Sequence, residues 1–254
     1  MKFSMNNKEM KEVFDSIQVK GKYAGTSGFS SSSLGSTVQM ILNGNNLRIY
    51  NGNATFIARA DITVTGEQDG SCVCDVTKVL SYLKTFSDTV TFTSNDFITL
   101  QSGNKKATIP LITGHDTSVY DRITQMVGDT GYTLNPTEMP SFGSSSYEGV
   151  FVVTSDDFSS CMQSMELVKA GTYKLDFTDD RRVVFSSRQS TENRYQERLT
   201  TVHTHGDAAT VEFTSPLHKF FNKGQLLNFY VKDEFPILIV AEDRLVVKAP
   251  SVSS

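Results

Sequence analysis

The sequence predicts an α+β protein built from two similar domains, and three observations support this prediction. An alternating segment leads into an amphipathic helix at Lys8–Ile17, and a second such segment leads into a helix at Asp156–Leu167. The predicted N-caps of these helices, Asn7 and Ser155, have the same register at an offset of 155 − 7 = 148. Most of the remaining chain alternates between polar and apolar residues, which is typical of antiparallel sheets with one wet face.

A second unit of strand and helix also recurs. The first copy places a helix at Val76–Phe86 after Asp75, and the second places a helix at Pro216–Lys223 after Ser215, an offset of 215 − 75 = 140. Proline is favoured at the first position of a helix. A length of 254 residues suits about two domains. We therefore expect two duplicated domains, each with antiparallel sheets that carry two helices on one face.

The strands are predicted from alternation and from turn residues. In the first half they are Thr37–Leu42, Leu47–Tyr50, Ala54–Ile62, Thr89–Thr93, Phe97–Gln101 and Lys106–Ile112. In the second half they are Tyr173–Phe177, Arg182–Ser187, Tyr195–Val202, Leu226–Val231, Pro236–Ala241 and Leu245–Lys248. The predicted turns are Asn43-Gly44, Asn51-Gly52, Ser102-Gly103 and Thr178–Asp180.

Between the halves, glycine, proline and a serine run interrupt every periodicity. The predicted organisation is a first domain at 1–113, a connector at 114–149 and a second domain at 150–254. The connector is too apolar for a simple spacer, since it contains Met126, Val127, Tyr132, Leu134, Met139 and Phe142. Two interpretations stay open, a linker that packs back on the sheets and a loop that binds a partner.

Charge and cysteine content narrow the class of protein. The net charge of −4 argues against a uniformly basic protein that grips nucleic acid through phosphates, although a local positive surface is compatible with it. Three cysteines leave one unpaired in any disulfide scheme, which indicates a reducing compartment. The most apolar stretch, Phe235–Ala241, is too short to span a bilayer, so we expect a soluble intracellular protein without membrane contact.

The sequence offers little for catalysis. The glycine-rich segment 21–28 has its lysine before the loop and no Gly-Lys-Ser/Thr that opens a helix, so it predicts a hairpin loop rather than a phosphate cradle. His203, His205 and Asp207 lack a supporting ligand shell, and Asp156-Asp157 suits the dipole of a helix start. We expect no enzyme activity, no metal and no cofactor.

The helices carry the stronger signal. Each buries an apolar stripe, and lysines lie off that stripe on three of the four predicted helices. Their recurrence in an acidic chain predicts one assembled positive surface. The residues of this surface are Lys8, Lys11, Lys20, Lys22, Lys78, Lys84, Lys169, His218, Lys219 and Lys223.

The duplicated units, the connector and the basic helices together resemble the DNA sliding clamps of the proliferating cell nuclear antigen (PCNA) type. The resemblance is most specific at the end of the chain, in residues 209–223, in Glu234–Val240 with its Phe-Pro-Ile, and in Val246–Pro250. The opening Met-Lys-Phe is also similar. Leu47–Tyr50 departs from the family pattern, and the connector lacks its acidic character. These departures indicate a divergent archaeal or viral member.

The resemblance implies a DNA polymerase processivity factor, a homotrimer closed head to tail around duplex DNA. Its implied partners are double-stranded DNA, a DNA polymerase and a clamp loader, and its location is the cytoplasm and nucleoid, or the host cytoplasm for a viral protein. The alternative is a monomeric processivity or protein-interaction module that does not encircle DNA.

The family's subunit contact would pair Lys106–Ile112 of one chain with Arg194–Val202 of the next, and Pro110 would remove one donor from that ladder. The implied interface residues are Lys106, Ile109, Leu111, Tyr195, Arg198 and Leu199. The family also binds partner peptides in an apolar groove. The implied groove residues are Met40, Leu134, Met139, Phe235, Pro236, Ile237, Val247, Ala249 and Pro250.

Overall fold

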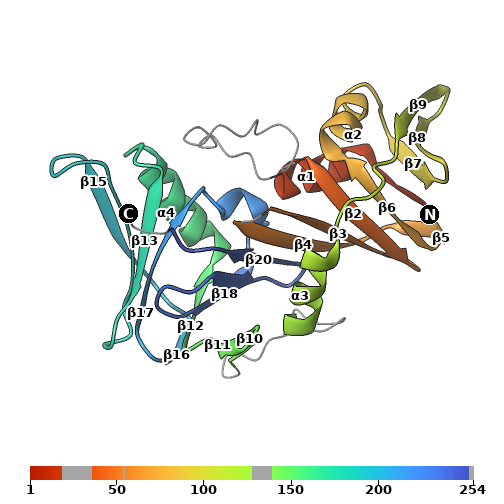
Figure 1. The fold of residues 1–254 in the computed structure, drawn as a ribbon. Helices are drawn as coiled ribbons and strands as arrows, with labels where there is room; N and C mark the ends of the chain where they lie inside the picture. Colours follow the sequence, from red (N-terminus) through yellow and green to blue (C-terminus); the bar gives the residue numbers. More distant parts are fainter. Residues whose placement is uncertain (19–35, 54, 128–138, 252–254) are drawn as a thin grey trace. The chain divides into compact units, whose positions relative to one another are not determined.

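The computed structural model describes residues 1–18, 36–53, 55–127 and 139–251 (Figure 1). The chain divides into two compact units, and the boundary between them along the chain lies between Tyr120 and Asp121. Unit 1 comprises the described residues up to Tyr120, and unit 2 comprises those from Asp121 onward. The division falls within the predicted connector and inside helix α3 (Ser118–Val127).

Unit 1 holds two antiparallel sets of strands and two helices, α1 (Asn7–Ile17) and α2 (Val76–Leu83). The first set has the order β5-β1-β7-β8-β9, with bounds Thr65–Gln68, Lys2–Asn6, Thr89–Ser94, Phe97–Ser102 and Lys105–Pro110. The second set has the order β4-β3-β2-β6, with bounds Phe56–Thr63, Asn46–Asn53, Thr37–Asn43 and Gly70–Asp75.

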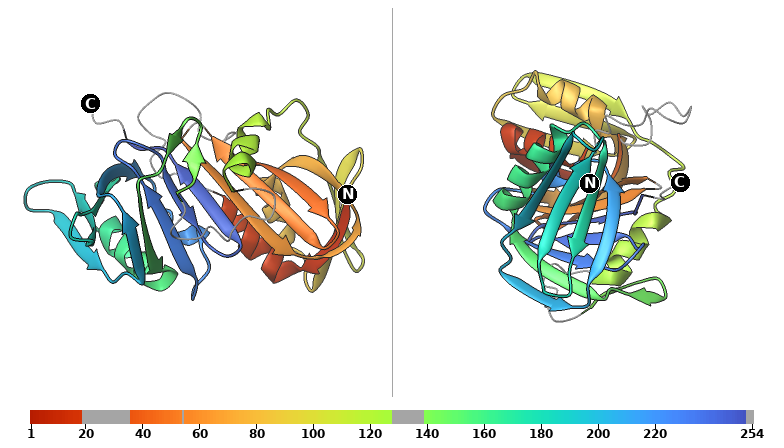
Figure 2. Two further views of the ribbon diagram at one scale, coloured as in Figure 1. Left: turned by 90° about the horizontal axis from the view of Figure 1, so that it is seen from below. Right: turned by 90° about the vertical axis from the view of Figure 1, so that its left-hand side faces the viewer.

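Unit 2 repeats this plan with one full helix, α4 (Ser155–Glu166), and a short 3-10 turn η1 (His218–Phe220). One set has the order β16-β12-β18-β19-β20, with bounds His203–Gly206, Gly149–Thr154, Leu226–Val231, Ile237–Val240 and Arg244–Lys248. The other has the order β15-β14-β13-β17, with bounds Arg194–Leu199, Val183–Arg188, Thr172–Phe177 and Ala209–Thr214. Figure 2 shows α4, in green, against one face of the strands of its unit. A two-residue hairpin, β10 (Ser141–Phe142) with β11 (Ser145–Ser146), precedes β12.

The duplication predicted from the sequence is confirmed by the topology. In each unit, a strand and a helix are followed by five strands, then by a helix or turn, and then by three strands. The strand orders of the two sets in unit 1 correspond to those in unit 2. A buried aromatic pair marks the repeat. Phe3 stacks on Phe92 at 5.0 Å between ring centroids, and Phe151 stacks on Phe229 at 4.8 Å. Phe3 and Phe151 are separated by 151 − 3 = 148 positions, the offset predicted from the helix starts.

The helix caps lie one residue earlier than predicted. Asn6 and Thr154 are the N-caps, and their side chains accept hydrogen bonds from Lys8 N and Asp157 N, so the offset of 154 − 6 = 148 is kept. The predicted cap Asn7 is buried and instead donates from Nδ2 to two carbonyl oxygens after α2 and at its end. Ser155 Oγ accepts a hydrogen bond from Gln225 N. Asp75 is the N-cap of α2, as predicted.

All twelve predicted strands occur, within a few residues of their expected ends, but three other predictions were wrong or incomplete. Asn51-Gly52 is no turn: β3 continues through it because buried Asn51 donates from Nδ2 to Ile17 O at the end of α1, 2.6 Å away. The predicted fourth helix is only the three-residue turn η1. Helix α3 was not predicted, since it lies in a segment that the glycines and prolines marked as irregular.

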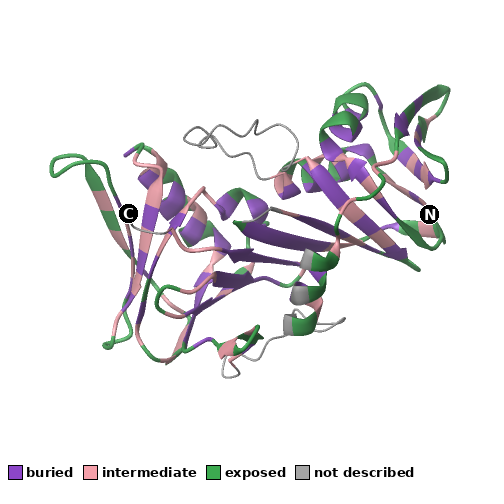
Figure 3. Ribbon diagram, in the orientation of Figure 1, coloured by how far each residue is buried: buried purple, intermediate pink, exposed green. Residues whose placement is uncertain are grey.

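The buried residues, purple in Figure 3, lie on the strands and helices of each unit and form its core. Strand β7 illustrates the pattern, with Val90, Phe92 and Ser94 buried and the residues between them more exposed. In the described part of the chain, no helix is long and apolar enough to cross a bilayer.

Candidate functional site

Helix α1 presents a mixed charged face. Its buried stripe is Met10, Val13, Phe14 and Ile17, as predicted. Lys8 is exposed and lies 3.9 Å from Glu12, an ion pair between successive turns, and Lys11 is half-buried. Glu9 and Asp15 are exposed as well. Two lysines are thus mixed with three carboxylates on this helix, which gives it a net charge of 2 − 3 = −1.

Helix α2 is the more strongly basic helix. Its buried stripe is Val76, Val79, Leu80 and Leu83. Lys78 is exposed, as is Lys84 at the C-cap, and the helix itself contains no carboxylate. The outward face therefore carries two uncompensated positive charges, and Tyr82, with 41% of its surface exposed, lies between them in sequence.

Helix α4 contributes negative rather than positive charge. Asp156 and Asp157 are exposed in its first turn, where they complement the helix dipole, and the helix contains no lysine or arginine. Lys169 follows the helix and is exposed. Lys20 and Lys22 lie outside the described residues, as does the predicted loop at 21–28.

The region of the predicted fourth helix presents two lysines, Lys219 and Lys223, which are exposed. His218 does not belong to that surface, because only 4% of it is exposed and desolvation lowers its pKa. Its Nε2 lies 3.9 Å from Glu166 Oε2.

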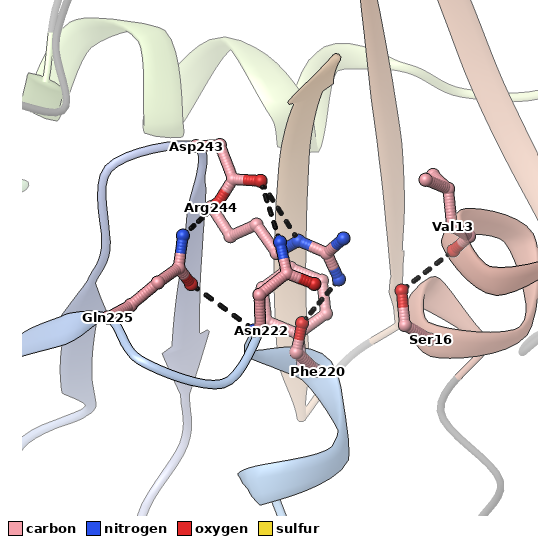
Figure 4. A network of polar contacts seen from close by, with 7 residues as sticks. All are labelled: Val13, Ser16, Phe220, Asn222, Gln225, Asp243 and Arg244. Carbon is pink, nitrogen blue, oxygen red and sulfur yellow. Dashed lines mark hydrogen bonds and ion pairs between the residues drawn. The ribbon is translucent and has the colours of Figure 1, made fainter. Parts of the chain in front are cut away.

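A buried arginine contacts the end of the short turn η1, after which Phe221 is extended, with φ of −95° and ψ of 146°. Arg244 Nη1 donates to Phe220 O at 2.6 Å, so the guanidinium occupies the carbonyl at the end of η1 (Figure 4). Asp243 accepts from Asn222 Nδ2 at 3.1 Å and from Gln225 Nε2 at 2.8 Å, which fixes the following turn. Ser215, the predicted cap, has φ of +76°, a left-handed conformation unlike that of a helix cap.

The two strands that were expected to meet between subunits, β9 and β15, both lie at sheet edges. β9 ends the order β5-β1-β7-β8-β9, and β15 ends the order β15-β14-β13-β17. Of the six expected interface residues, Lys106 and Arg198 are exposed, and Leu111 and Tyr195 are half-buried. Ile109 and Leu199 instead face the interior of their own units, with exposed fractions of 1% and 4%.

In unit 2, the predicted apolar groove residues meet at one end of a hairpin. Ile237 pairs with Lys248 and Leu238 with Val247, so the segments Phe235-Pro236 and Ala249-Pro250 flank the same end of β19 and β20. These four flanking residues are half-buried, whereas Ile237 and Val247 are buried. We call Phe235, Pro236, Ile237, Val247, Ala249 and Pro250 the β19–β20 surface.

Aromatic side chains that the sequence did not single out as a cluster pack against this surface. The ring of Tyr147 lies 5.3 Å from that of Phe235 and 6.2 Å from that of Tyr230, and Phe142 lies 6.2 Å from Phe235. Burial raises the pKa of Tyr147, whose hydroxyl has no hydrogen-bond partner among the described residues. The second half of the connector thus packs against its own unit. Met139 is half-buried, Met40 is buried within unit 1, and Leu134 lies outside the described residues.

Unit 1 contains a further polar cluster that sequence reasoning missed. Asp61 lies 2.9 Å from Arg48 Nε and 2.7 Å from Arg59 Nη2, and Arg59 is fully buried. Tyr50, which pairs with Arg59 across β3 and β4, stacks on Tyr120 of α3 at 5.1 Å. The alternation of charged residues at 48, 59 and 61 was the available signal. Tyr50 and Tyr120 both belong to unit 1, so this stack links the first turn of α3 to strand β3 within that unit.

The three cysteines are deeply buried. Desolvation raises the pKa of Cys72 to about 11, burial raises the pKa of Cys74 well above its ordinary value, and desolvation together with Glu197 raises the pKa of Cys161 to about 12. His203 and His205 lie on one face of β16, opposite Val152 and Val150. Within the described ranges, no three histidine, cysteine, aspartate or glutamate side chains cluster as a metal ion would require.

The fold of the chain is that of DNA sliding clamps. A structure of A. fulgidus PCNA bound to the C-terminal region of FEN-1 matches with a TM-score of 0.70 and 13% identity, over 100% of this chain and 99% of that chain. A putative DNA polymerase III beta subunit from Eubacterium rectale matches with a TM-score of 0.74 and 13% identity, over 100% of this chain and 66% of that one.

The Helicobacter pylori beta clamp bound to a DNA ligase peptide also matches, with a TM-score of 0.67, 12% identity and coverage of 100% of this chain and 67% of that chain. The chain therefore spans nearly the whole A. fulgidus PCNA chain and about two thirds of the E. rectale and H. pylori chains. No model of a protein family matches the sequence, and no curated protein matches it at the sequence level.

Proposed function

We propose that the protein is a sliding clamp for DNA replication, a processivity factor whose subunits close head to tail into a homotrimeric ring around duplex DNA. The observation that carries this proposal is the duplicated two-unit topology, which matches an archaeal clamp over its full length. Strands β9 and β15 add support, because both lie at sheet edges and could pair between neighbouring subunits. Such a head-to-tail contact must close into a ring or continue as a filament. The protein would act inside the cell, as a divergent archaeal or viral clamp.

The helices supply the proposed surface toward DNA. Lys8, Lys11, Lys78 and Lys84 lie on α1 and α2, and Lys169, Lys219 and Lys223 lie beside α4 and η1. Carboxylates of α1 and α4 are interspersed with them, so phosphate contacts would be weak and independent of sequence. Weak contacts suit a ring that holds DNA by its topology and slides. A separate ATP-driven loader would open the ring, and catalysis is not part of the proposal.

Encirclement can be tested with linear duplexes whose ends are open or blocked. The protein is first threaded onto a duplex with free biotinylated ends, and streptavidin is then added to half of the sample. After a wash with high salt, we expect retention only on the blocked duplex, because an encircling ring leaves by the ends. Equal loss from both duplexes would favour the alternative, a module that does not encircle DNA. The mass in solution, expected near three times 28.1 kDa, gives the subunit count.

The β19–β20 surface is the proposed site for partner peptides. The A. fulgidus clamp structure contains the C-terminal region of FEN-1, and the H. pylori clamp structure contains a DNA ligase peptide. In this chain, a peptide with an aromatic anchor would contact the half-buried Phe235, Pro236, Ala249 and Pro250. The competing interpretation is that Phe142 and Tyr147 of the connector already fill this surface.

Isothermal titration distinguishes these interpretations. The C-terminal peptide of the cognate DNA polymerase is titrated into the wild type and into a variant with Pro236→Asp and Ala249→Asp. We expect the variant to lose at least tenfold in affinity, since an aspartate carboxylate at the contact must be desolvated. Val202→Asp is the matched control, because Val202 is 63% exposed and belongs to the same unit. Equal binding by the wild type and the double variant would place recruitment elsewhere.

A further inference from the structure

The outward face of edge strand β9 carries a positive charge. Side chains alternate along the strand, so that Ala107 and Ile109 are buried while Lys106, Thr108 and Pro110 are exposed. Phe97, which pairs with Pro110 and is 58% exposed, extends this face onto β8. Lys106 is thus the charged residue on this face of β9, and the strand contains no carboxylate.

The outward face of edge strand β15 is also positive. Tyr195, Glu197 and Leu199 alternate on the side where the strand contacts α4, and Tyr195 OH donates to Glu197 at 2.6 Å. Arg188 of β14 pairs with Arg194 and adds a third guanidinium beside the edge. The outward residues of β15 are Arg194, Gln196 and Arg198, all exposed.

The backbone of β9 is suited to pairing at this edge. Ser102 pairs with Lys105 across a two-residue turn, and hydrogen-bonded and non-hydrogen-bonded pairs alternate along an antiparallel ladder. The peptide groups of Lys106 and Thr108 therefore point away from β8. Pro110 follows in the same phase but lacks a donor. A strand added at this edge would form only a few backbone hydrogen bonds with β9. These bonds could therefore offset little of an unfavourable interaction between like charges.

We propose that like charges on β9 and β15 oppose closure of the ring, so that the subunit contact becomes tighter as ionic strength rises. The inference rests on the proposed function, in which β9 of one copy pairs with β15 of the next. Side chains directly opposite on one face of a sheet lie about 5 Å apart, and diagonal neighbours lie about 7–8 Å apart. When the two six-residue strands pair antiparallel and overlap fully, Lys106 would lie opposite Arg198, and a shift of two residues would place it diagonal to both Arg194 and Arg198.

Salt acts on this repulsion and leaves the attractive contributions largely intact. The Debye length is about 30 Å at 0.01 M salt and about 10 Å at 0.1 M, so added salt screens exposed charges separated by several ångströms. Backbone pairing and burial of Phe97 are not screened in this way. A ring held mainly by opposite charges would show the reverse dependence and dissociate as salt is added.

Sedimentation equilibrium of the full-length protein from 20 to 300 mM NaCl tests this inference. For the wild type we expect the dissociation constant of the subunit contact to fall about tenfold over this range, as screening removes the repulsion. Lys106→Glu and Arg198→Glu should each tighten the contact at 20 mM and abolish or reverse the salt trend. The two substitutions together should give less than the sum of the single effects, because the new carboxylates then face each other.

Lys223→Glu is the matched control, an exposed lysine outside both edge strands, and it should keep the wild-type trend. If added salt strengthened association through apolar contacts alone, Lys106→Glu would keep the same trend as well, and the inference would be wrong. A wild-type contact that weakens or stays constant with salt would also overturn it while leaving the ring in place. A chain that is monomeric at every salt and protein concentration would instead overturn the proposed ring.

Discussion

Asn7 Nδ2 lies 2.7 Å from the carbonyl oxygen of Phe86, and the same amide donates to Leu83 O at 3.1 Å. One buried side chain at the start of α1 thus satisfies two carbonyls at the end of α2 and just beyond it. Leu83 O also accepts a long bond from Phe86 N at 3.4 Å, and the Asn7 amide adds a second donor there while serving Phe86 O, as a C-cap would. The contact joins the two helices that carry most of the proposed DNA-facing lysines.

Replacing Asn7 by alanine should therefore destabilise unit 1. We expect a loss of about 2 kcal/mol in the free energy of unfolding, because Phe86 O loses the Asn7 donor and Leu83 O keeps only the long bond from Phe86 N. Asn6→Ala, which removes only an exposed N-cap, should cost about 1 kcal/mol. Urea denaturation followed by circular dichroism measures both. Asn7→Asp keeps the size of the side chain but cannot donate, so a variant as stable as the wild type would show that packing, not hydrogen bonding, explains the effect.

The sequence predicted what depends on local pattern. Alternation located the strands, and the repeated helix starts revealed the duplication, because Asn6 and Thr154 begin helices at equivalent positions. The prediction of Asn7 rather than Asn6 as the N-cap was wrong. Both residues suit a cap, and only the burial of Asn7 against α2 decides between them. The turn predicted at Asn51-Gly52 was wrong for a similar reason, because the Asn51 side chain donates to Ile17 O and the strand continues.

Features that depend on distant residues were not predictable. The predicted fourth helix ends after η1, where Phe221 is extended and Phe220 O accepts from Arg244, which lies 24 positions further along the sequence. Helix α3 is held by the stacking of Tyr120 on Tyr50. The resemblance implied contact roles for Ile109 and Leu199, but their alternation within β9 and β15 directs them into the core of each unit. Alternation was visible in the sequence, although the face that each strand buries was not.

The helix lysines should act together in holding DNA. Replacing Lys8, Lys11, Lys78, Lys84 and Lys219 by glutamate should abolish stimulation of polymerase processivity, while fold and trimer mass stay unchanged because exposed charges contribute little to stability. Primer extension on a long single-stranded circle measures processivity. The same five positions changed to arginine keep the charge and should retain activity. Normal processivity of the glutamate variant would remove these helices from the DNA-facing surface.

The three cysteines should be unreactive in the folded protein. Desolvation raises the pKa of Cys72 to about 11, and all three thiols are buried, so few thiolates form at pH 8. We expect no reaction with a thiol reagent at pH 8 under native conditions and three modified cysteines per chain after denaturation in urea. Rapid native labelling of any cysteine would mean that its unit opens on the timescale of the reaction.

Lys248 should make stability depend on pH in the alkaline range. The side chain is only 3% exposed at the end of β20, and desolvation lowers its pKa from 10.5 to about 8. Between these two values the unfolded state binds the proton more tightly than the folded state, so the contribution of Lys248 to stability rises with pH. Below pH 8 the folded protein must bury an ammonium group, and that cost is fully present.

A Lys248→Met variant isolates this contribution, because the cysteines titrate equally in both proteins. We expect the variant to exceed the wild type in unfolding free energy most strongly at pH 7, and this difference to shrink by an amount on the order of 3 kcal/mol as the pH approaches 10.5. Urea denaturation at several pH values gives the difference directly. Lys232→Met is the control: Lys232 forms a half-exposed ion pair with Glu148, so its effect should change little over the same range. A difference for Lys248→Met that stays constant from pH 7 to 10.5 would show that the amine is hydrated in solution.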